Sequence, residues 1–400
     1  MRSAVALRLV DQGAWSAAFF LLTITASHVL DVDDFASLTV VTSVGVVAAA
    51  CARAFAMDGR IVAAARHGLG VEQALSSRVV LASSALFALL AVVASALWLL
   101  LGPVQTGLPT TFLAALIVLA DGPHFLLTMR RRFRTAIIGA APYALVAAVA
   151  ATSALVGAQV DVLAVWAIGL VLSSIASWAA VSRLPRRAVS VPAASGTSSR
   201  IAAEALYSAL GSQLGILIVY LVASPAATAG IRLTYSVVYA PAFSIIQALT
   251  PLLLVRMSEL DANGGRARGR LAARWVLGGL VGVAASGVAG WGAAATGLAG
   301  SASTLVLPFL VPIGAALLGN LVLDAALLVL RFRTHARTPH RVRLAVVTGD
   351  LAVQLVLTLW FGLVGLVTAL VAMAVVKVVV AALARRSGPV TALPEGAVRT

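Results

Sequence analysis

Charged residues are scarce in this sequence. They make up 11% of its 400 residues, whereas a typical soluble domain carries about 25% because its surface must face water. Apolar residues account for 61% of the chain, and its mean hydropathy is +1.03. The composition excludes a soluble enzyme and predicts an integral membrane protein that is entirely α-helical.

Cysteine and lysine are almost absent. Cys51 is the only cysteine and lies in an apolar run, which excludes a disulfide framework and a thiolate metal site. Lys377 is the only lysine, so arginine carries nearly all of the positive charge in a chain with a formal charge of +15. The arginines form short clusters between apolar runs, a pattern that encodes membrane topology rather than nucleic-acid binding. We therefore expect no nucleic-acid partner.

Apolar runs of about 20 residues, the length that crosses a bilayer core of ~30 Å as a helix, recur along the whole chain. Twelve such runs occur, at roughly residues 11–30, 36–56, 79–101, 110–129, 136–157, 162–182, 201–223, 227–255, 275–298, 304–330, 344–363 and 365–384. The first run follows Arg2 and Arg8 but lacks a small-residue cleavage site, so we interpret it as a helix rather than a signal peptide.

The positions of the arginines predict the orientation. Alternate connections between the runs are basic, and so are both ends of the chain. The basic connections carry Arg60, Arg66 and Arg78; Arg130, Arg131, Arg132 and Arg134; Arg183, Arg186 and Arg187; Arg256, Arg266, Arg268 and Arg270; and Arg331, Arg333, Arg337, Arg341 and Arg343. The intervening connections hold almost no arginine. This bias predicts that both termini are cytoplasmic.

The longest polar stretch divides the chain into two halves. Residues 183–200 include Pro185, Pro192 and Gly196 and are typical of a flexible linker. We therefore predict a six-helix bundle at residues 1–182, a cytoplasmic linker at 183–200, a second six-helix bundle at 201–384 and a cytoplasmic tail at 385–400. Two equal halves suggest a duplicated unit with a central site at their interface.

Ionisable residues at membrane depth are costly and are therefore candidates for function. We predict that four cations line a central cavity and bind substrate: Arg53, His124, Arg232 and Lys377. Three acids are candidates for ion coupling: Asp121, Asp324 and Asp350. Structural alternatives remain open, namely snorkelling of the long cations to the interface and pairing of Asp324 and Asp350 with each other or with Lys377.

Asp121 and His124 stand three residues apart and therefore share one helix face. Gly122 and Pro123 between them weaken the backbone hydrogen bonds, as at the broken helices that flank many transport sites. The alternative is a kinked helix with a local Asp–His hydrogen bond. Asp11 and Glu204, near the starts of their helices, are interpreted as acids at the water boundary.

The run Asp31-Val-Asp33-Asp34 resembles a metal-binding motif of membrane glycosyltransferases that use lipid-linked sugar donors. Those enzymes need a large outer loop to enclose donor and acceptor, whereas only a few residues separate the first two runs here. The sequence also contains no P-loop, no His/Cys metal spacing and no Ser/His/Asp set with a plausible aqueous site. We therefore expect no enzyme activity, metal or cofactor.

Several short motifs recur in order along the chain. The first half contributes Asp11-Gln-Gly-Ala-Trp15-Ser16, Phe20-Leu-Leu-Thr, Leu30-Asp-Val-Asp-Asp-Phe35-Ala36 and Asp121-x-x-His124-Phe125, and the second half contributes Gly211-Ser-Gln213, Pro225-Ala-Ala-x-x-Gly230 and Ala240-Pro241. Together these motifs resemble the polysaccharide-export flippases. The resemblance covers most of residues 8–260. It departs from the family where His124 replaces an arginine, which exchanges a permanent cation for one that can titrate.

The resemblance implies the multidrug/oligosaccharidyl-lipid/polysaccharide exporter superfamily, with two six-helix bundles arranged as a V. It implies a flippase for lipid-linked oligosaccharides in the bacterial cytoplasmic membrane, with the lipid-linked glycan, membrane lipids and other polysaccharide-assembly proteins as partners. Because no ATP-binding motif is present, the energy would come from an ion gradient or the substrate gradient. A cation-coupled drug or metabolite antiporter of the same superfamily is the main alternative, followed by a membrane glycosyltransferase or polymerase and by an assembly scaffold.

Overall fold

The computed structural model describes residues 2–66, 69–101, 109–184, 198–207, 225–260, 265–295, 306–333 and 337–386. Every element in these ranges is helical, and no strand occurs among them. The predicted all-α fold is confirmed for the part of the chain described. The motif Gly211-Ser-Gln213 and most of the predicted linker and tail lie outside these ranges.

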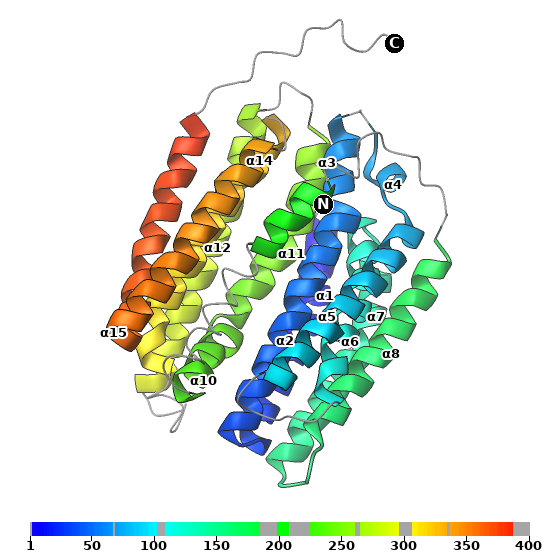
Figure 1. The fold of residues 1–400 in the computed structure, drawn as a ribbon. Helices are drawn as coiled ribbons and strands as arrows, with labels where there is room; N and C mark the ends of the chain where they lie inside the picture. The colour runs from blue at the N-terminus through cyan, green and yellow to red at the C-terminus, as the bar shows by residue number, and fades with distance from the viewer. Residues whose placement is uncertain are drawn as a thin grey trace, which may run out of the picture.

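The first half of the chain forms one group of helices, coloured blue to green in Figure 1. Its elements are α1 (Arg2–Val29), α2 (Val32–Arg53), the π-helical segment η1 (Ala54–Asp58), α3 (Gly59–Arg66), α4 (Val71–Ala74), α5 (Ser77–Leu101), α6 (Pro109–Met129), α7 (Phe133–Leu155) and α8 (Val162–Ser182). Asp31 caps α2, and Asp161 caps α8. Each side chain accepts hydrogen bonds from backbone N–H groups of the first turn, so Asp31 and Asp161 act as helix N-caps.

The second half forms a neighbouring group, at the left of Figure 1. It comprises a helix at 198–207, α10 (Pro225–Leu233), the π-helical segment η2 (Thr234–Val238), α11 (Ala240–Ser258), α12 (Gly265–Ala295), the short η3 (Leu307–Phe309), α14 (Leu310–Arg333) and α15 (Arg337–Arg386). The last of these contains a reversal at Gly362, where φ is 57° and ψ is −136°. Glycine reaches this backbone region without a steric cost, and the reversal creates two antiparallel legs.

Nine helices within the described ranges are long and apolar enough to cross a membrane. The ninth, Thr338–Ala384, has 47 residues and contains the two predicted spans 344–363 and 365–384. The predicted total of twelve spans and the cytoplasmic side of the termini stay predictions. The N-terminus and the end of α15 do lie toward the same end of the molecule (Figure 1).

Small residues allow neighbouring helices to approach closely, as in many membrane proteins. The Ser173 hydroxyl of α8 donates to the Gly139 carbonyl of α7 at 2.7 Å. A Cβ atom added at Gly45 of α2 would lie 3.0 Å from the Ala114 backbone of α6. A methyl group at either glycine would therefore compete with a neighbouring helix for space.

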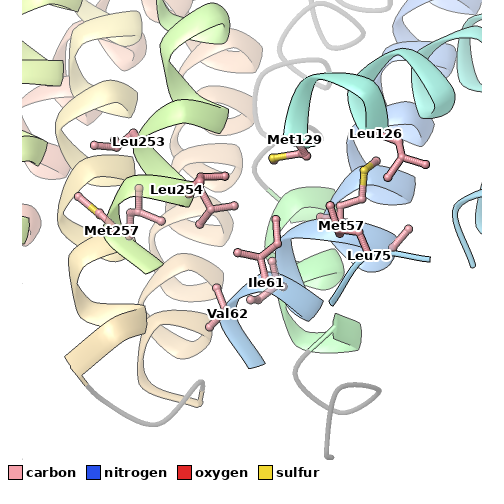
Figure 2. Packing of buried hydrophobic residues seen from close by; sticks show 14 of the residues in the cluster. Met57, Ile61, Val62, Leu75, Leu126, Met129, Leu253, Leu254 and Met257 are labelled. Atoms are coloured by element: carbon pink, nitrogen blue, oxygen red, sulfur yellow. The ribbon is translucent and has the colours of Figure 1, made fainter. Parts of the chain in front are cut away.

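The two halves meet in an apolar cluster, which we call the inter-half cluster (Figure 2). Its members include Met57, Ile61, Val62, Leu75, Leu126 and Met129 of the first half and Leu253, Leu254 and Met257 of the second. Arg131 and Glu259 form an ion pair between the halves, and Gly59 packs against Ser198. The halves are thus closed against each other at this end, which the predicted topology places at the cytoplasm.

Candidate functional site

Five ionisable residues gather inside the first half, and we call them the first-half charge cluster: Arg8 and Asp11 of α1, Arg53 of α2, and Asp121 and His124 of α6. The Arg53 guanidinium donates to Asp121 Oδ1 at 3.1 Å and lies 5.0 Å above the Phe125 ring. Arg53 therefore turns into the bundle toward an acid, instead of snorkelling to the surface.

Asp11 lies at the centre of this cluster and is fully buried. Its Oδ2 atom accepts from Arg8, which also donates to Gln12 Oε1 at 2.8 Å. Its Oδ1 atom faces His124 Nε2 at 3.3 Å. The Trp15 ring stacks on the His124 ring, with centroids 4.7 Å apart and an interplanar angle of 22°. The interpretation of Asp11 as an acid at the water boundary is wrong, because its carboxylate is buried among these side chains.

The Asp121–His124 pair does not form, although the two residues are three apart. Asp121 bonds to Arg53, and His124 faces Asp11 on another helix. The predicted break at Gly122 and Pro123 is absent as well, because α6 continues through both residues. Pro123 has no N–H group to donate to the Leu119 carbonyl, and the Ser174 hydroxyl of α8 supplies a donor there at 3.3 Å.

Arg232 lies at the boundary between the two halves. Its side chain is on α10 and is 6% exposed. The guanidinium donates to Thr42 Oγ1 of α2 at 3.2 Å and lies 5.4 Å above the Phe19 ring of α1. Among the residues described, no carboxylate lies within 4 Å of it. A buried cation without a counter-charge is costly, so Arg232 is the strongest candidate to meet an anion.

The second half contains its own ion pairs, of which Lys377–Asp350 is buried on both sides and Arg343–Asp324 only on the arginine side. Lys377 donates to Asp350 Oδ2 at 2.5 Å, and Gln354 Nε2 donates to Asp350 Oδ1 at 2.8 Å. Asp324 accepts from Arg343. Each of the three acids predicted to couple ions, Asp121 included, therefore has a cationic partner. Pairing of Asp350 with Lys377 was one of the alternatives left open by the sequence.

Glu204 is a buried acid whose partner the sequence analysis did not identify. It is 1% exposed and accepts from Arg331 Nε at 3.1 Å and from Arg331 Nη2 at 2.5 Å. Its interpretation as an acid at the water boundary is also wrong. The available signal was its position near the start of the first helix of its half, which matches the position of Asp11.

The four cations predicted to line one cavity thus occupy three places. Arg53 and His124 belong to the first-half charge cluster, Arg232 lies between the halves, and Lys377 is buried within the second half. Residues that contact these cations and were absent from the predicted site include Asp11, Trp15 and Thr42. Of these, Thr42 of α2 lies where the halves meet, because its hydroxyl accepts from Arg232 of the second half.

No family model and no curated protein matches the sequence. Solved structures do match it, and several of them are transporters. The eukaryotic MATE transporter AtDTX14 is 14% identical with a TM-score of 0.65, over 95% of this chain and 93% of that chain. The lipid II flippase MurJ in an inward closed conformation is 10% identical with a TM-score of 0.63, over 97% and 88%. A MOP superfamily transporter from Pyrococcus furiosus is 12% identical with a TM-score of 0.64, over 95% and 94%. The chain therefore has the fold of these transporters.

Proposed function

We propose that the protein is a flippase that moves lipid-linked oligosaccharides across the cytoplasmic membrane by alternating access. The fold supports transport, since the similar structures include both a lipid II flippase and drug transporters. The choice of an anionic, lipid-linked substrate rests on Arg232 and on the sequence motifs of the first half.

The proposal rests mainly on Arg232, because no carboxylate among the described residues compensates its positive charge, which a ligand could therefore meet. The guanidinium has five N–H donors in a planar fork that matches phosphate oxygens. In the structure it donates to one neutral hydroxyl, that of Thr42, and packs on the Phe19 ring. A phosphate group between the halves would supply the missing negative charge and accept the remaining donors.

A flippase of this kind must replace the water that hydrates the head group of its substrate. A phosphate and several sugars cannot enter hydrocarbon without losing the hydrogen bonds that water provides. Polar groups between the halves can replace that water while the lipid tail stays in the bilayer. The inter-half cluster closes one end of the boundary mainly through apolar side chains, so two apolar surfaces can separate there when the halves move.

The proposal is tested with purified protein in liposomes that contain a fluorescent polyprenyl-pyrophosphate sugar. A membrane-impermeant reagent that quenches the outer leaflet reports how fast the lipid crosses. We expect the wild type to accelerate crossing and Arg232→Gln to reduce it at least tenfold. Arg256→Gln is the matched control, because Arg256 is an exposed arginine at the end of α11, the helix that follows η2.

Equal rates for Arg232→Gln and the wild type would remove Arg232 from the site. No acceleration by wild-type protein would contradict the flippase itself. The antiporter remains the second candidate, favoured by the buried ionisable pairs in both halves. Deletion of the gene separates the two functions, since a flippase mutant accumulates lipid-linked intermediates on the cytoplasmic leaflet. Unchanged intermediates with altered drug tolerance would favour the antiporter.

A further inference from the structure

Four arginines occur in the first ten residues of α12: Arg266, Arg268, Arg270 and Arg274. Arg268 points into the protein, where it is 6% exposed and donates to the carbonyls of Met257 and Leu260 at the end of α11. The other three arginines are exposed. The protein interior therefore accounts for Arg268 alone, and the three exposed cations need a separate explanation.

The three exposed arginines extend a face of α12 that is apolar along the rest of the helix. They follow one another at intervals of four residues, and the apolar members of the same face are all at least 59% exposed. These members are Leu277, Val281, Val288 and Trp291. With 3.6 residues per turn, all seven side chains fall within an arc of about 100°. Because α12 is long and apolar enough to cross a membrane, this exposed apolar face is the one that meets lipid.

The length of α12 places Arg274 below the level of the lipid head groups. An exposed tryptophan near the end of a span is typical of the membrane interface, which is where we place Trp291. A hydrocarbon core of ~30 Å corresponds to about 20 helical residues, so the opposite boundary lies near Leu271. Arg270 is then at this boundary, and Arg274 is about 5 Å inside it. Because helical side chains lean toward the N-terminus and arginine can snorkel, both guanidinium groups reach the level of the phosphates.

The protein supplies no counter-charge to these cations. Among the residues described, Arg266, Arg270 and Arg274 form no ion pair and no hydrogen bond. Helix α12 itself contains no acid, and like charges four residues apart repel each other. The positive-inside bias requires arginines near the end of a span but does not require them on its lipid-facing side. Their alignment is explained by an anion that comes from the lipid.

We propose that Arg270 and Arg274, with Arg266 one turn nearer the start of the helix, bind the phosphate group of an anionic phospholipid. The lipid belongs to the leaflet at this end of the molecule, which is the cytoplasmic leaflet in the predicted topology. Guanidinium groups match phosphate oxygens with two parallel N–H donors, and the acyl chains lie along Leu277 and Val281. The head group is anionic because no acid is present on α12 to meet the ammonium group of a zwitterionic lipid. The occupant is a membrane lipid rather than the transported molecule, so the inference does not depend on the proposed function.

The site lies one helix away from the contact that closes the two halves. On the opposite face of α12, Arg268 holds the end of α11 through the Met257 carbonyl, and Met257 belongs to the inter-half cluster. A phospholipid on the outer face therefore fixes α12 at the level where its inner face holds α11. We expect an anionic lipid to raise the melting temperature of the protein.

Native mass spectrometry of the purified full-length protein in detergent measures the binding. Phosphatidylglycerol and phosphatidylcholine with identical acyl chains are added in turn. We expect the wild type to bind phosphatidylglycerol at least tenfold more tightly, and the double variant Arg270→Gln with Arg274→Gln to retain less than a threefold preference. The matched control is Arg78→Gln with Arg134→Gln, which also removes two exposed arginines near helix starts, but from two separate helices, α5 and α7. This control should keep the tenfold preference.

An unchanged preference in the Arg270 and Arg274 double variant would overturn the site. An equal loss in the control would show that total charge, rather than this face of α12, attracts the lipid, and would overturn it as well. If the double variant is not monodisperse, Arg274→Gln alone takes its place, with an expected loss of at least threefold. Thermal unfolding then compares phosphatidylglycerol with inorganic phosphate at the same concentration. We expect only the lipid to raise the melting temperature, and an equal rise with phosphate would replace the phospholipid by a soluble anion.

Discussion

Lys377 and Asp350 lie on the two legs of α15, and both side chains are at least nine-tenths buried. Removing one partner of such a pair leaves an uncompensated charge inside the protein, whereas replacing both by apolar residues is often tolerated. Single and double substitutions can therefore distinguish the effect of the pair on stability from its effect on transport. The same logic applies to Glu204 and Arg331 in the same half.

We predict that Lys377→Met lowers the free energy of unfolding by about 3–5 kcal/mol, because Asp350 then stays buried without its cation. The double variant Lys377→Met with Asp350→Leu should recover most of this loss. Thermal unfolding in detergent, followed by size-exclusion chromatography, measures both variants. If the double variant is stable but does not flip lipid, the Lys377–Asp350 pair has a role in transport. A single variant as stable as the wild type would show that the pair contributes nothing to stability.

At the residue scale, the sequence predicted which ionisable side chains are candidates for function, but it did not predict which residues they contact. It selected Arg232 because a lone cation near the outer end of a span is unusual, and the structure places this side chain between the halves. It missed Asp11, because an acid in the first turns of a helix is usually hydrated. The partner that removes Asp11 from water, His124, lies on another helix far along the chain, so no local pattern could reveal the contact.

In the described part of the chain, two π-helical segments occur, η1 after α2 and η2 between α10 and α11. Such segments interrupt the regular backbone ladder and are frequent at functional sites. Tyr239 follows η2 directly and is 3% exposed. Its hydroxyl donates to the Leu310 carbonyl of α14 at 2.7 Å. The ring thereby fixes the irregular part of this helix against its neighbours.

Substitution of Gly314 in α14 tests how closely Tyr239 packs against this helix. A Cβ atom at Gly314 would lie 2.5 Å from the Tyr239 hydroxyl, so we predict that Gly314→Ala destabilises the protein by about 1–3 kcal/mol through overpacking. Tyr239→Phe in the same chain should restore part of the loss by removing that oxygen. Gly278→Ala in α12 is the matched control, because its new methyl group meets nothing within 4 Å. Equal melting temperatures for Gly314→Ala and Gly278→Ala would contradict this account.

Element type was predictable from the sequence, whereas interruptions within elements were not. Long apolar runs correspond to helices throughout the described ranges, since length and hydropathy determine what can cross a bilayer. Hydropathy carries no information about an extra residue in one helical turn, so η1 and η2 were not expected. Gly122 and Pro123 suggested a break in α6 that did not occur, because Ser174 of the neighbouring helix compensates for the missing donor.

On the scale of the whole molecule, the two halves close against each other through apolar contact. Figure 2 shows Ile61 and Val62 between Leu254 and Met257 on one side and Met57 and Leu75 on the other. The Arg131–Glu259 pair joins the halves nearby, but both side chains are exposed, and such pairs contribute only about 0–1 kcal/mol. Apolar burial therefore accounts for most of the closure, and opening must expose this surface to water.

Gly59 lies at a tight backbone contact between the two halves. It begins α3 in the first half, and a Cβ atom there would overlap the backbone of Ser198 in the second half. Because backbone cannot rotate away as a long side chain can, we predict that Gly59→Ala pushes the halves apart at this end. Gly70→Ala is the control, since its new methyl group would have no neighbour closer than 3.9 Å.

Labelling of a cysteine at Ile61 measures the separation. In a Cys51→Ala background, Ile61→Cys should react slowly with a water-soluble maleimide, because Ile61 is 1% exposed in the closed arrangement. Adding Gly59→Ala should raise the labelling rate at least tenfold, and adding Gly70→Ala should leave it unchanged. If Gly59→Ala labels as slowly as its parent while the protein stays folded, then the contact between Gly59 and Ser198 does not limit closure. The apolar surfaces would in that case hold the halves together even with the added methyl group between them.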